Sequence, residues 1–372
     1  MPDLSGPISQ AVAKGSVIVC VGAGGVGKTT TAASIGLHAA LGGKSALVCT
    51  IDPAKRLANS LGLKALGNTE ARVPESYFRE AGLNPDAPLF AMMLDIKQTW
   101  DELIARLAPP DQKERILSNR IYQALSTALA GSQEYIALEK LWQLRNQRDY
   151  GIIVLDTPPT AHALDFLEAP NRILDFLDNE AARWLLTPAL SAGKVGLKLF
   201  NLGGTFIAKT LARITGTELL RELANFMLAI GGMNEDFRDR ARGVRDLLTS
   251  EATAFILVTT PARERMEETV NFWRLLKDHR MTVAAIVVNR VHTAGSGSFA
   301  EELGTLAPTL AAKVQQTLHE VQLLAEADAK GLAELARRCH PTPLLTVPRF
   351  EGDVHDLKGL FSIGEALFRE GA

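Results

Sequence analysis

The sequence predicts an α/β protein: a doubly wound, mostly parallel sheet of about seven or eight strands, with an inserted α-helical subdomain. Two observations predict this class. Short apolar runs rich in β-branched residues recur along the chain, and helical patterns lie between most of them. In contrast, the roughly 90 residues from Thr160 to Ser250 show strong helical periodicity and no convincing strand.

Most of the predicted strands are apolar on both faces, as parallel strands covered by helices must be. They are Ser16–Val21, Ser45–Thr50, Leu89–Leu94, Ile152–Leu155, Ala254–Thr259, Val283–Val288 and Leu344–Val347. A further helical block is expected over Asp101–Arg148, and Ala294–Ser298 is expected to be a loop.

Composition excludes several classes of protein. The 372 residues carry a formal net charge of −2, which gives no electrostatic reason to bind nucleic acid. Charged residues make up 22% and hydrophobic residues 47%, so wholesale disorder is excluded. Three cysteines cannot form a disulfide framework, and no apolar run reaches the length of a signal peptide or a membrane span. We therefore expect a cytoplasmic protein with no transmembrane segment.

A phosphate-binding loop is predicted at Gly22–Thr29, which matches G-x-x-x-x-G-K-[ST] between a strand and a helix expected from about Thr30. Its glycines let backbone N–H groups curl around an anion, and the helix N-terminus adds partial positive charge. Lys28 is expected to reach the β- and γ-phosphates and Thr29 to bind Mg²⁺. The predicted nucleotide-binding residues here are Gly24, Gly25, Val26, Gly27, Lys28, Thr29 and Thr30.

A second metal carboxylate is predicted at Asp156, directly after the apolar strand Ile152–Leu155. Such an aspartate holds Mg²⁺ through water in P-loop enzymes; the alternative is an aspartate that caps a turn. The residues that follow lie where a switch sensing the γ-phosphate would lie. These switch residues are Thr157, Pro158, Pro159, Thr160 and His162.

Asp52 is a candidate for the group that orients the attacking water. It follows the strand Ser45–Thr50, at the edge of the sheet where the P-loop lies. It also precedes Pro53, so it could cap the next helix instead. The local sequence supports both interpretations equally.

Together these motifs resemble the family of arsenite-pump and tail-anchored-protein targeting ATPases, in the deviant-Walker, dimer-forming (SIMIBI) class of P-loop NTPases. The resemblance extends over most of the predicted core, from near residue 16 to near residue 360. It rests on GAGGVGKTT (Gly22–Thr30), TIDPAKRL (Thr50–Leu57), LDTPPTAHALDFLEAP (Leu155–Pro170), IVVNR (Ile286–Arg290) and VPRFEGDVHDLKGL (Val347–Leu360).

The resemblance implies roles for matched positions. It makes Asp52 the catalytic aspartate of switch I, which activates water, and Lys28 a catalytic residue. The residues from Thr157 to His162 resemble switch II. Asn289 resembles the residue that reads adenine, since its amide both donates and accepts; the alternative is a turn asparagine. Pro348 and Phe350 resemble part of the loop packed on the base.

Because the P-loop and the base-binding end must meet at one nucleotide, we expect residues 1–372 to form a single ATPase domain. Its core would comprise residues 14–100, 150–170 and 250–372. The helical subdomain would comprise segments of about 101–148 and 171–249.

One departure from the family lies at Ala23, where the deviant-Walker signature has a lysine that reaches the other subunit's nucleotide. Comparable cations supplied in trans contribute about 10³–10⁵ in rate. A homodimer is therefore expected to hydrolyse ATP slowly, or to use another cation such as Lys55, Arg56 or Arg263, each of which has a surface or structural role as its alternative. The third possibility is a heterodimer with a related ATPase that keeps the lysine.

The second departure concerns cysteine. Arsenite pumps bind the soft metalloid with clustered thiols, and the targeting branch bridges its dimer with zinc through a CxxC motif. Here Cys20 and Cys49 lie in predicted strands, Cys339 stands alone, and there is no CxxC. The sequence therefore disfavours arsenite efflux and predicts no zinc.

The helical insertion resembles the region that holds a client's transmembrane helix in the targeting branch. The stretch Arg183–Met233 is rich in apolar residues, namely Trp184, Leu185, Leu186, Leu197, Leu199, Phe200, Phe206, Ile207, Phe226, Met227 and Met233. These residues could form an exposed groove for a hydrophobic-helix or membrane-protein client, or pack the subdomain's own core.

The leading hypothesis is a dimeric ATPase whose ATP-driven closure controls the helical subdomain. One alternative is a weakly hydrolytic regulatory subunit paired with a catalytic paralogue. Another is a septum- or chromosome-positioning ATPase, but the tail Phe361–Ala372 has one Arg against two Glu and so attracts anionic lipid weakly.

Overall fold

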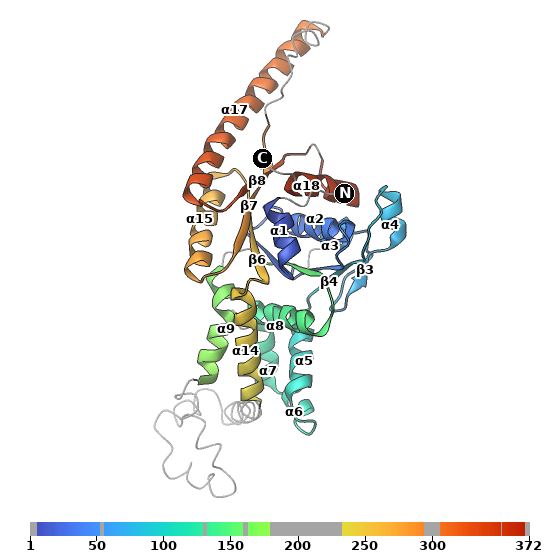
Figure 1. Cartoon of the computed structure of the whole chain (residues 1–372), viewed down its shortest axis with the longest axis vertical. Helices are drawn as coiled ribbons and strands as arrows, with labels where there is room; N and C mark the ends of the chain where they lie inside the picture. The colour runs from blue at the N-terminus through green and yellow to red at the C-terminus, as the bar shows by residue number, and fades with distance from the viewer. Residues whose placement is uncertain are drawn as a thin grey trace, which may run out of the picture. The chain divides into compact units, whose positions relative to one another are not determined.

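The computed structural model describes residues 6–52, 56–128, 132–158, 163–178, 233–293, 306–350 and 352–368. One eight-stranded sheet, in the order β3-β4-β2-β5-β1-β6-β7-β8, forms the centre of the fold (Figure 1). Its strands are β1 (Val17–Val21), β2 (Ala46–Thr50), β3 (Ala71–Arg72), β4 (Leu89–Met93), β5 (Ile152–Asp156), β6 (Thr253–Thr259), β7 (Val283–Val291) and β8 (Leu344–Pro348).

Helices alternate with most of these strands. They are α1 (Pro7–Lys14), α2 (Lys28–Leu41), α3 (Arg56–Ser60), α4 (Glu75–Glu80), α5 (Ile96–Leu107), α6 (Lys113–Leu117), α7 (Arg120–Ala128), α8 (Ser132–Gln147), α9 (Ala163–Asp178), α14 (Asn234–Thr249), α15 (Arg263–Asp278), α17 (Pro308–Arg338) and α18 (Leu357–Phe368). The predicted class, a doubly wound and mostly parallel α/β fold, is confirmed.

The strand order confirms the parallel sheet, with one exception. All strand pairs run parallel except β3–β4, which is antiparallel. All seven predicted strands are present, and β7 continues to Val291, three residues beyond the predicted end. The edge strand β3 was not predicted, because two residues (Ala71 and Arg72) are too few to show a period.

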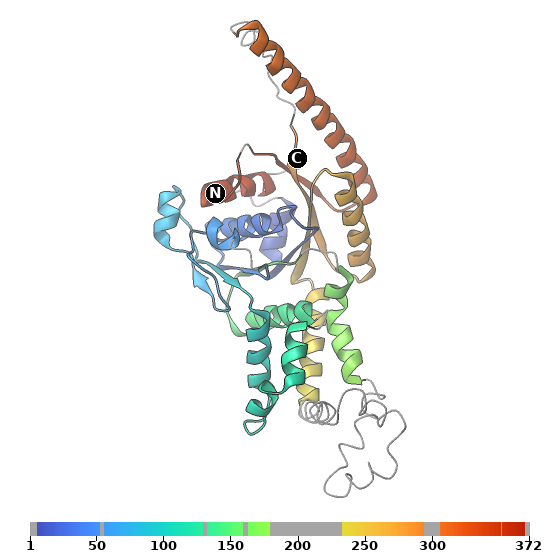
Figure 2. The same ribbon diagram turned by 180° about the vertical axis from the view of Figure 1, so that it is seen from behind.

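One face of the sheet is covered by α1, α2 and α18, as both views show (Figures 1 and 2). The core on this face takes alternate residues from the strands, such as Ile18, Val48, Val154 and Ile256, all fully buried. Helix α1 ends at Lys14, the residue at which the predicted core begins, so nearly all of it lies before that boundary. Its Ile8 and Val12 belong to the same core cluster.

The opposite face also lacks solvent contact, since every residue of β1, β2, β5 and β6 is buried. Helix α15 packs on β6 and β7 there, and α17 packs on α15 and β7. Burial on both faces explains why these strands read as continuous apolar runs in the sequence.

The chain divides into two compact units. The first contains the sheet and comprises Met1–Leu94, Arg145–Ala163 and Leu248–Ala372. The second comprises Asp95–Leu144 and Leu164–Leu247, and its described part is helical. Its core includes Leu103, Ile104, Ile136, Met233 and Phe237. A buried carboxylate, Glu139, accepts a hydrogen bond from Arg240 within this unit.

The predicted client groove falls largely outside the described residues. Of its apolar residues only Met233 is described, and it is buried in the core of the second unit. The predicted loop Ala294–Ser298 also lies outside the described residues. Over the described ranges, no helix has both the length and the apolar character needed to cross a membrane.

Candidate functional site

The P-loop connects β1 to α2 at the centre of the sheet. Gly25 and Gly27 have φ angles of 77° and 100°, a left-handed conformation that side chains oppose. Helix α2 begins at Lys28, two residues before the predicted start, and its N-cap Gly27 makes no side-chain cap bond. The loop thus ends on a helix N-terminus whose N-cap residue is a glycine and has no side chain to cap it, which favours an anion.

Lys28 is buried at the start of α2. Its Nζ donates to the Ala23 backbone oxygen at 2.9 Å, so the ammonium group folds back over the loop. Burial lowers the pKa of Lys28, while the charges of Asp156 and Asp52 partly oppose this shift. The predicted phosphate-binding lysine therefore lies in the field of both predicted carboxylates.

Asp156, the last residue of β5, brings the predicted metal residues together. Its Oδ2 accepts hydrogen bonds from the hydroxyls of Thr29 at 2.6 Å and Thr50 at 2.8 Å. The side chain is 1% exposed, and its Oδ1 has no hydrogen-bond partner among the described residues. Burial raises the pKa of Asp156 to about 6, although the two hydroxyl bonds and Lys28 oppose the shift.

These side chains fit Mg²⁺. The ion prefers oxygen ligands and keeps several waters, so one hydroxyl and one carboxylate nearby suffice from the protein. A buried carboxylate oxygen without a partner costs free energy unless something else binds it. The free Oδ1 of Asp156 is therefore suited to a water of a hydrated cation, beside the Thr29 hydroxyl.

Thr50 is a site residue that the sequence analysis did not single out. It ends β2, directly beside β5, where the register pairs it with Asp156. Its hydroxyl donates to Asp156 and accepts the backbone N–H of Asp52 at 3.1 Å. Thr50 thus links the predicted metal carboxylate to the predicted water-orienting aspartate. Its place at the strand end next to Asp52 was the available signal.

The first switch II residue is held to the P-loop strand. Thr157 is buried, and its hydroxyl and backbone N–H both donate to the Cys20 carbonyl, at 2.9 Å and 3.3 Å. Pro158 follows and is half-buried. Pro159, Thr160 and His162 lie outside the described residues, so their predicted role stays a prediction.

Asn289, the predicted base reader, contacts the P-loop directly. Its Nδ2 donates to the Val26 carbonyl at 2.9 Å, and its Oδ1 accepts the N–H of Arg290 at 2.9 Å. A side chain at Gly27 would place Cβ 2.2 Å from the same Nδ2. Arg290 has a φ of 61°, so the chain turns sharply just after this contact. The structure therefore brings Asn289 to the loop, 263 residues away in sequence.

Pro348 and Phe350 lie beside the end of β7. Pro348 ends β8 and pairs with Val291, and the N–H of Arg349 donates to the Val291 carbonyl at 3.0 Å. Phe350 is exposed. These residues are brought near the strand that carries Asn289, but no contact joins them to the P-loop within the described ranges.

The site lacks a cation at the signature position, as the sequence requires. Ala23 is buried, and its carbonyl already accepts from Lys28. Of the substitutes considered, Arg56 and Arg263 are the first residues of α3 and α15 and are exposed, whereas Lys55 lies outside the described residues. The charge of Arg56 acts on Lys28 and contributes to the lowering of its pKa, so Arg56 is the one of these two arginines with an electrostatic link to the P-loop among the described residues.

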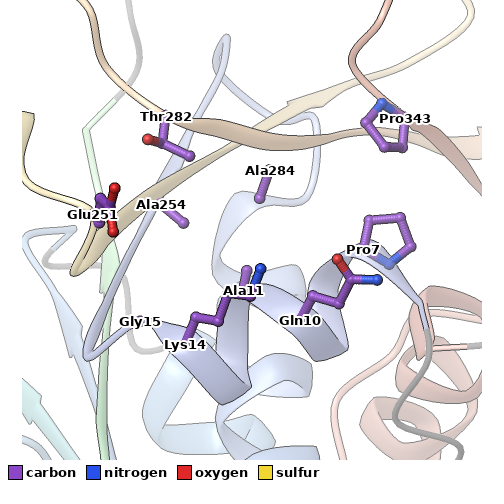
Figure 3. A pocket seen from close by; sticks show the side chains of 10 residues that line it. All are labelled: Pro7, Gln10, Ala11, Lys14, Gly15, Glu251, Ala254, Thr282, Ala284 and Pro343. Carbon is purple, nitrogen blue, oxygen red and sulfur yellow. The ribbon is translucent and has the colours of Figure 1, made fainter.

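A cavity of about 410 Å³ lies elsewhere, at the opposite edge of the sheet (Figure 3). It is lined by α1, through Gln10 and Lys14, and by the first residues of strands, including Ala254 of β6 and Ala284 of β7. The P-loop follows the last residue of β1. The cavity therefore lies at the amino ends of the parallel strands and the P-loop lies at their carboxyl ends, so this cavity is not the nucleotide site.

The sheet and its loops define a P-loop NTPase fold: β1 leads through a glycine-rich loop into α2, with Asp156 at the end of the adjacent β5. The sequence profile described as anion-transporting ATPase matches residues 15–368, and the chain belongs to this family. The predicted resemblance is thereby confirmed.

Three proteins with similar sequences are consistent with this family. ATPase get3 of Aspergillus terreus is 26% identical over 301 residues, covering 80% of each chain. ATPase GET3B of Arabidopsis thaliana is 28% identical over 289 residues, 73% of this chain and 62% of that protein. ATPase ARSA1 of Chlamydomonas reinhardtii is 26% identical over 289 residues. The match covers only 34% of ARSA1, about a third of its length.

Proposed function

We propose that the chain binds ATP with Mg²⁺ and hydrolyses it to ADP and phosphate. The observation that carries this proposal is the cluster at Asp156, where two threonine hydroxyls share one buried carboxylate oxygen and the other oxygen has no hydrogen-bond partner among the described residues. Lys28 lies in the field of this carboxylate, at the N-terminus of α2. The relatives named above are all ATPases, which supports the same reaction.

Each residue then has a task. Thr29 and, through water, Asp156 hold Mg²⁺, which neutralises phosphate charge when bound. Lys28 leaves the Ala23 carbonyl and binds the β- and γ-phosphates, together with the backbone of Gly24–Gly27 and Thr30. Asp52 orients the attacking water, and its backbone bond to Thr50 supports that position.

The remaining predicted residues belong to the base and the switch. Asn289 reads the adenine amino group and ring nitrogen while keeping its bond to Val26, since an amide has two N–H donors and an acceptor. Pro348 and Phe350 pack on the base. Thr157, Pro158, Pro159, Thr160 and His162 form switch II, which relays loss of the γ-phosphate.

The test is Mg²⁺-dependent phosphate release by the purified chain, compared with its Asp52→Asn variant. We expect nucleotide affinity to be retained and turnover to fall by at least about 10²-fold, as general base loss does. The matched control is Asp86→Asn, an acidic residue away from the loop. Undetectable ATP binding by the folded wild-type chain would overturn the proposal.

We further propose that the chain works as a nucleotide-gated dimer. Ala23 supports an alternative form of this proposal. In it, the chain is a slowly hydrolysing subunit that pairs with a related ATPase, which has a lysine at the position of Ala23. Light scattering with and without ATP, on the chain alone and co-expressed with such an ATPase, separates the two. Robust turnover by the chain alone excludes an essential missing lysine.

The helical unit is the proposed place for a client's hydrophobic helix or for a partner, in a single ATPase domain located in the cytosol. Arsenite efflux is not proposed, because Cys20, Cys49 and Cys339 are each buried as separate free thiols and cannot form a metalloid cluster. No zinc site and no nucleic-acid partner are part of the proposal.

A further inference from the structure

The end of β7 is irregular at the residue that contacts the P-loop. The paired residues on either side are three apart in β7 and two apart in β8, so Asn289 and Arg290 together lie opposite one residue of β8. Arg290 has a φ of 61°, which residues with a side chain rarely adopt. Bulges of this kind re-aim side chains, and here Asn289 reaches the Val26 carbonyl. The direction of Asn289 therefore depends on how the bulge is held.

A buried carboxylate of α17 binds the chain just past the bulge. Oδ2 of Asp328 lies 2.8 Å from the backbone nitrogen of His292 and 2.9 Å from its ring Nδ1. A carboxylate only accepts, so both nitrogens donate to it. A single oxygen thus fixes the backbone and the side chain of His292 together, three residues after Asn289.

The other ring nitrogen of His292 reaches the segment proposed to pack on the base. Its Nε2 lies 3.3 Å from Nη1 of Arg349, and because a guanidinium only donates, Nε2 accepts and the ring proton is on Nδ1. The backbone N–H of Arg349 also donates to the carbonyl of the residue before His292, at 3.0 Å. Arg349 stands between Pro348 and Phe350 in the sequence. One chain of hydrogen bonds therefore runs from α17 to both strand ends that carry the proposed base-binding residues.

Helix α17 does not depend on Asp328 for its place on the sheet. Its last turns are fixed by the buried Leu335 and by an ion pair between Arg338 and Glu267 of α15. Among the described residues, the carboxylate of Asp328 is bound only by His292. Burying a carboxylate costs free energy that an apolar side chain would not cost. What the carboxylate adds is therefore the position of His292.

We propose that Asp328 is a positioning residue for the adenine base. Through His292 it holds the bulge in the form that directs Asn289 to the P-loop. Through His292 and Arg349 it also holds the segment that packs on the base. This inference rests on the proposed function, because it takes ATP as the ligand. The phosphate-binding and metal residues take no part in this chain of hydrogen bonds, so its loss should weaken recognition of the base and spare the chemistry at the phosphates.

The test compares nucleotide binding with turnover in Asp328→Leu, which removes the carboxylate and keeps a side chain of similar size. We expect the dissociation constant for ATP with Mg²⁺, measured by calorimetry, to rise about tenfold, the effect of losing hydrogen bonds to a charged acceptor. Affinity for inorganic tripolyphosphate, which has no base, and turnover at saturating ATP should stay within about twofold. Asp328→Asn, whose amide oxygen still accepts, should recover most of the ATP affinity. Glu326→Leu, at an exposed carboxylate of the same helix, is the matched control and should bind ATP normally.

A second set of variants tests the link itself, and it decides the question if Asp328→Leu does not fold. His292→Phe keeps a ring and removes both nitrogens, so it should weaken ATP binding as much as Asp328→Leu. The double variant should be no weaker than either single one, because both changes break the same link. His292→Asn keeps an N–H near the place of Nδ1 and loses only the contact with Arg349, so its ATP affinity should be intermediate.

The opposite results would overturn the positioning role. Folded Asp328→Leu and His292→Phe variants that bind ATP as tightly as the wild type would show that the link does not act on the base. Equal losses of ATP and tripolyphosphate binding would indicate general damage to the site. A wild-type chain that binds neither ligand would instead overturn the proposed function, so the two failures are distinguishable.

Discussion

The two most deeply buried carboxylates described in the molecule lie in different units, and they differ in their hydrogen-bond partners. Asp156 in the sheet unit is 1% exposed and Glu139 in the helical unit is 0% exposed. Burial raises the pKa of both. Each has one oxygen that lacks a hydrogen-bond partner within the described residues. Judged only by burial and by the direction of the pKa shift, the two carboxylates would be equally good candidates for a functional site.

The groups that bind the two carboxylates distinguish Glu139 from Asp156. Glu139 is bound by the guanidinium of Arg240, which also lies over the Trp142 ring at 5.2 Å. Asp156 is bound by neutral hydroxyls, which orient it without cancelling its charge. A guanidinium makes a closed ion pair in a core, whereas hydroxyls leave the negative charge available to a cation. The neighbours of a buried acid, rather than its burial, therefore indicate function.

The largest expected effect comes from neutralising each of the two buried carboxylates separately. Asp156→Asn keeps the size of the side chain and removes the charge, so ATP turnover should fall by about 10³-fold, the loss typical of a removed electrostatic group at a reaction centre. Glu139→Gln should leave turnover per folded molecule unchanged. Phosphate release normalised to the folded fraction measures both. Equal losses of turnover in the two variants would contradict the comparison.

Removing one member of the buried ion pair should destabilise the helical unit. Glu139→Ala leaves Arg240, whose side chain is only 13% exposed, without its partner ion, so the free energy of unfolding should fall by about 3–5 kcal/mol. The double variant Glu139→Met with Arg240→Leu should recover most of this loss, because an apolar pair replaces a desolvated one. Urea unfolding measures each step. A double variant no better than the single one would show that the pair is needed as ions.

The pH dependence of stability should report Asp156 in the nucleotide-free chain. Its pKa is about 6 when folded against 3.8 as the reference, so between these values the folded state holds a proton that the unfolded state has lost. This contribution is fully present below pH 3.8 and is lost as pH rises through 6. The expected loss, on the order of 3 kcal/mol, is the change in the difference between wild type and Asp156→Asn.

Denaturation at several pH values measures that difference, and Glu139 contributes equally to both proteins. Binding of Mg²⁺ with ATP at pH 6 should then release a proton from Asp156, visible by calorimetry in two buffers of different ionisation enthalpy. A pH-independent difference would show that Asp156 is not titrating in this range.

The smallest expected effect tests the hydroxyls. Thr50→Val removes one of the two donors to Asp156, so turnover should fall by about tenfold, the value of one hydrogen bond to a charged group. It should also raise the pKa of Asp156 further in the metal-free chain. Thr50→Ser keeps the hydroxyl and is the matched control. The variant and the control behaving alike would assign the effect to packing.

Much of the nucleotide end could be predicted because its signals are local. Strands β1 and β5 are continuous apolar runs, and the glycines, Lys28 and Thr29 stand in one short motif at the end of β1. The role of Asp52 in catalysis stays a prediction from the family. Strand β3 was not predicted, because a strand of two residues is too short to show a hydrophobic pattern.

Contacts between distant segments could not be predicted from local signals. The Arg240–Glu139 pair joins residues 101 positions apart, in a region where the sequence showed only helical periodicity.

The sequence by itself therefore determined most of the strands, the P-loop and the family, since continuous apolar runs and a strand–loop–helix motif depend on neighbouring residues. Only the tertiary structure decided that Thr50 and Thr29 meet on one oxygen of Asp156 and that Asn289 binds the Val26 carbonyl. Those contacts arise from strand order, which sets β2 and β1 on either side of β5. Strand order is settled by packing across the whole sheet, and no short stretch of sequence encodes it.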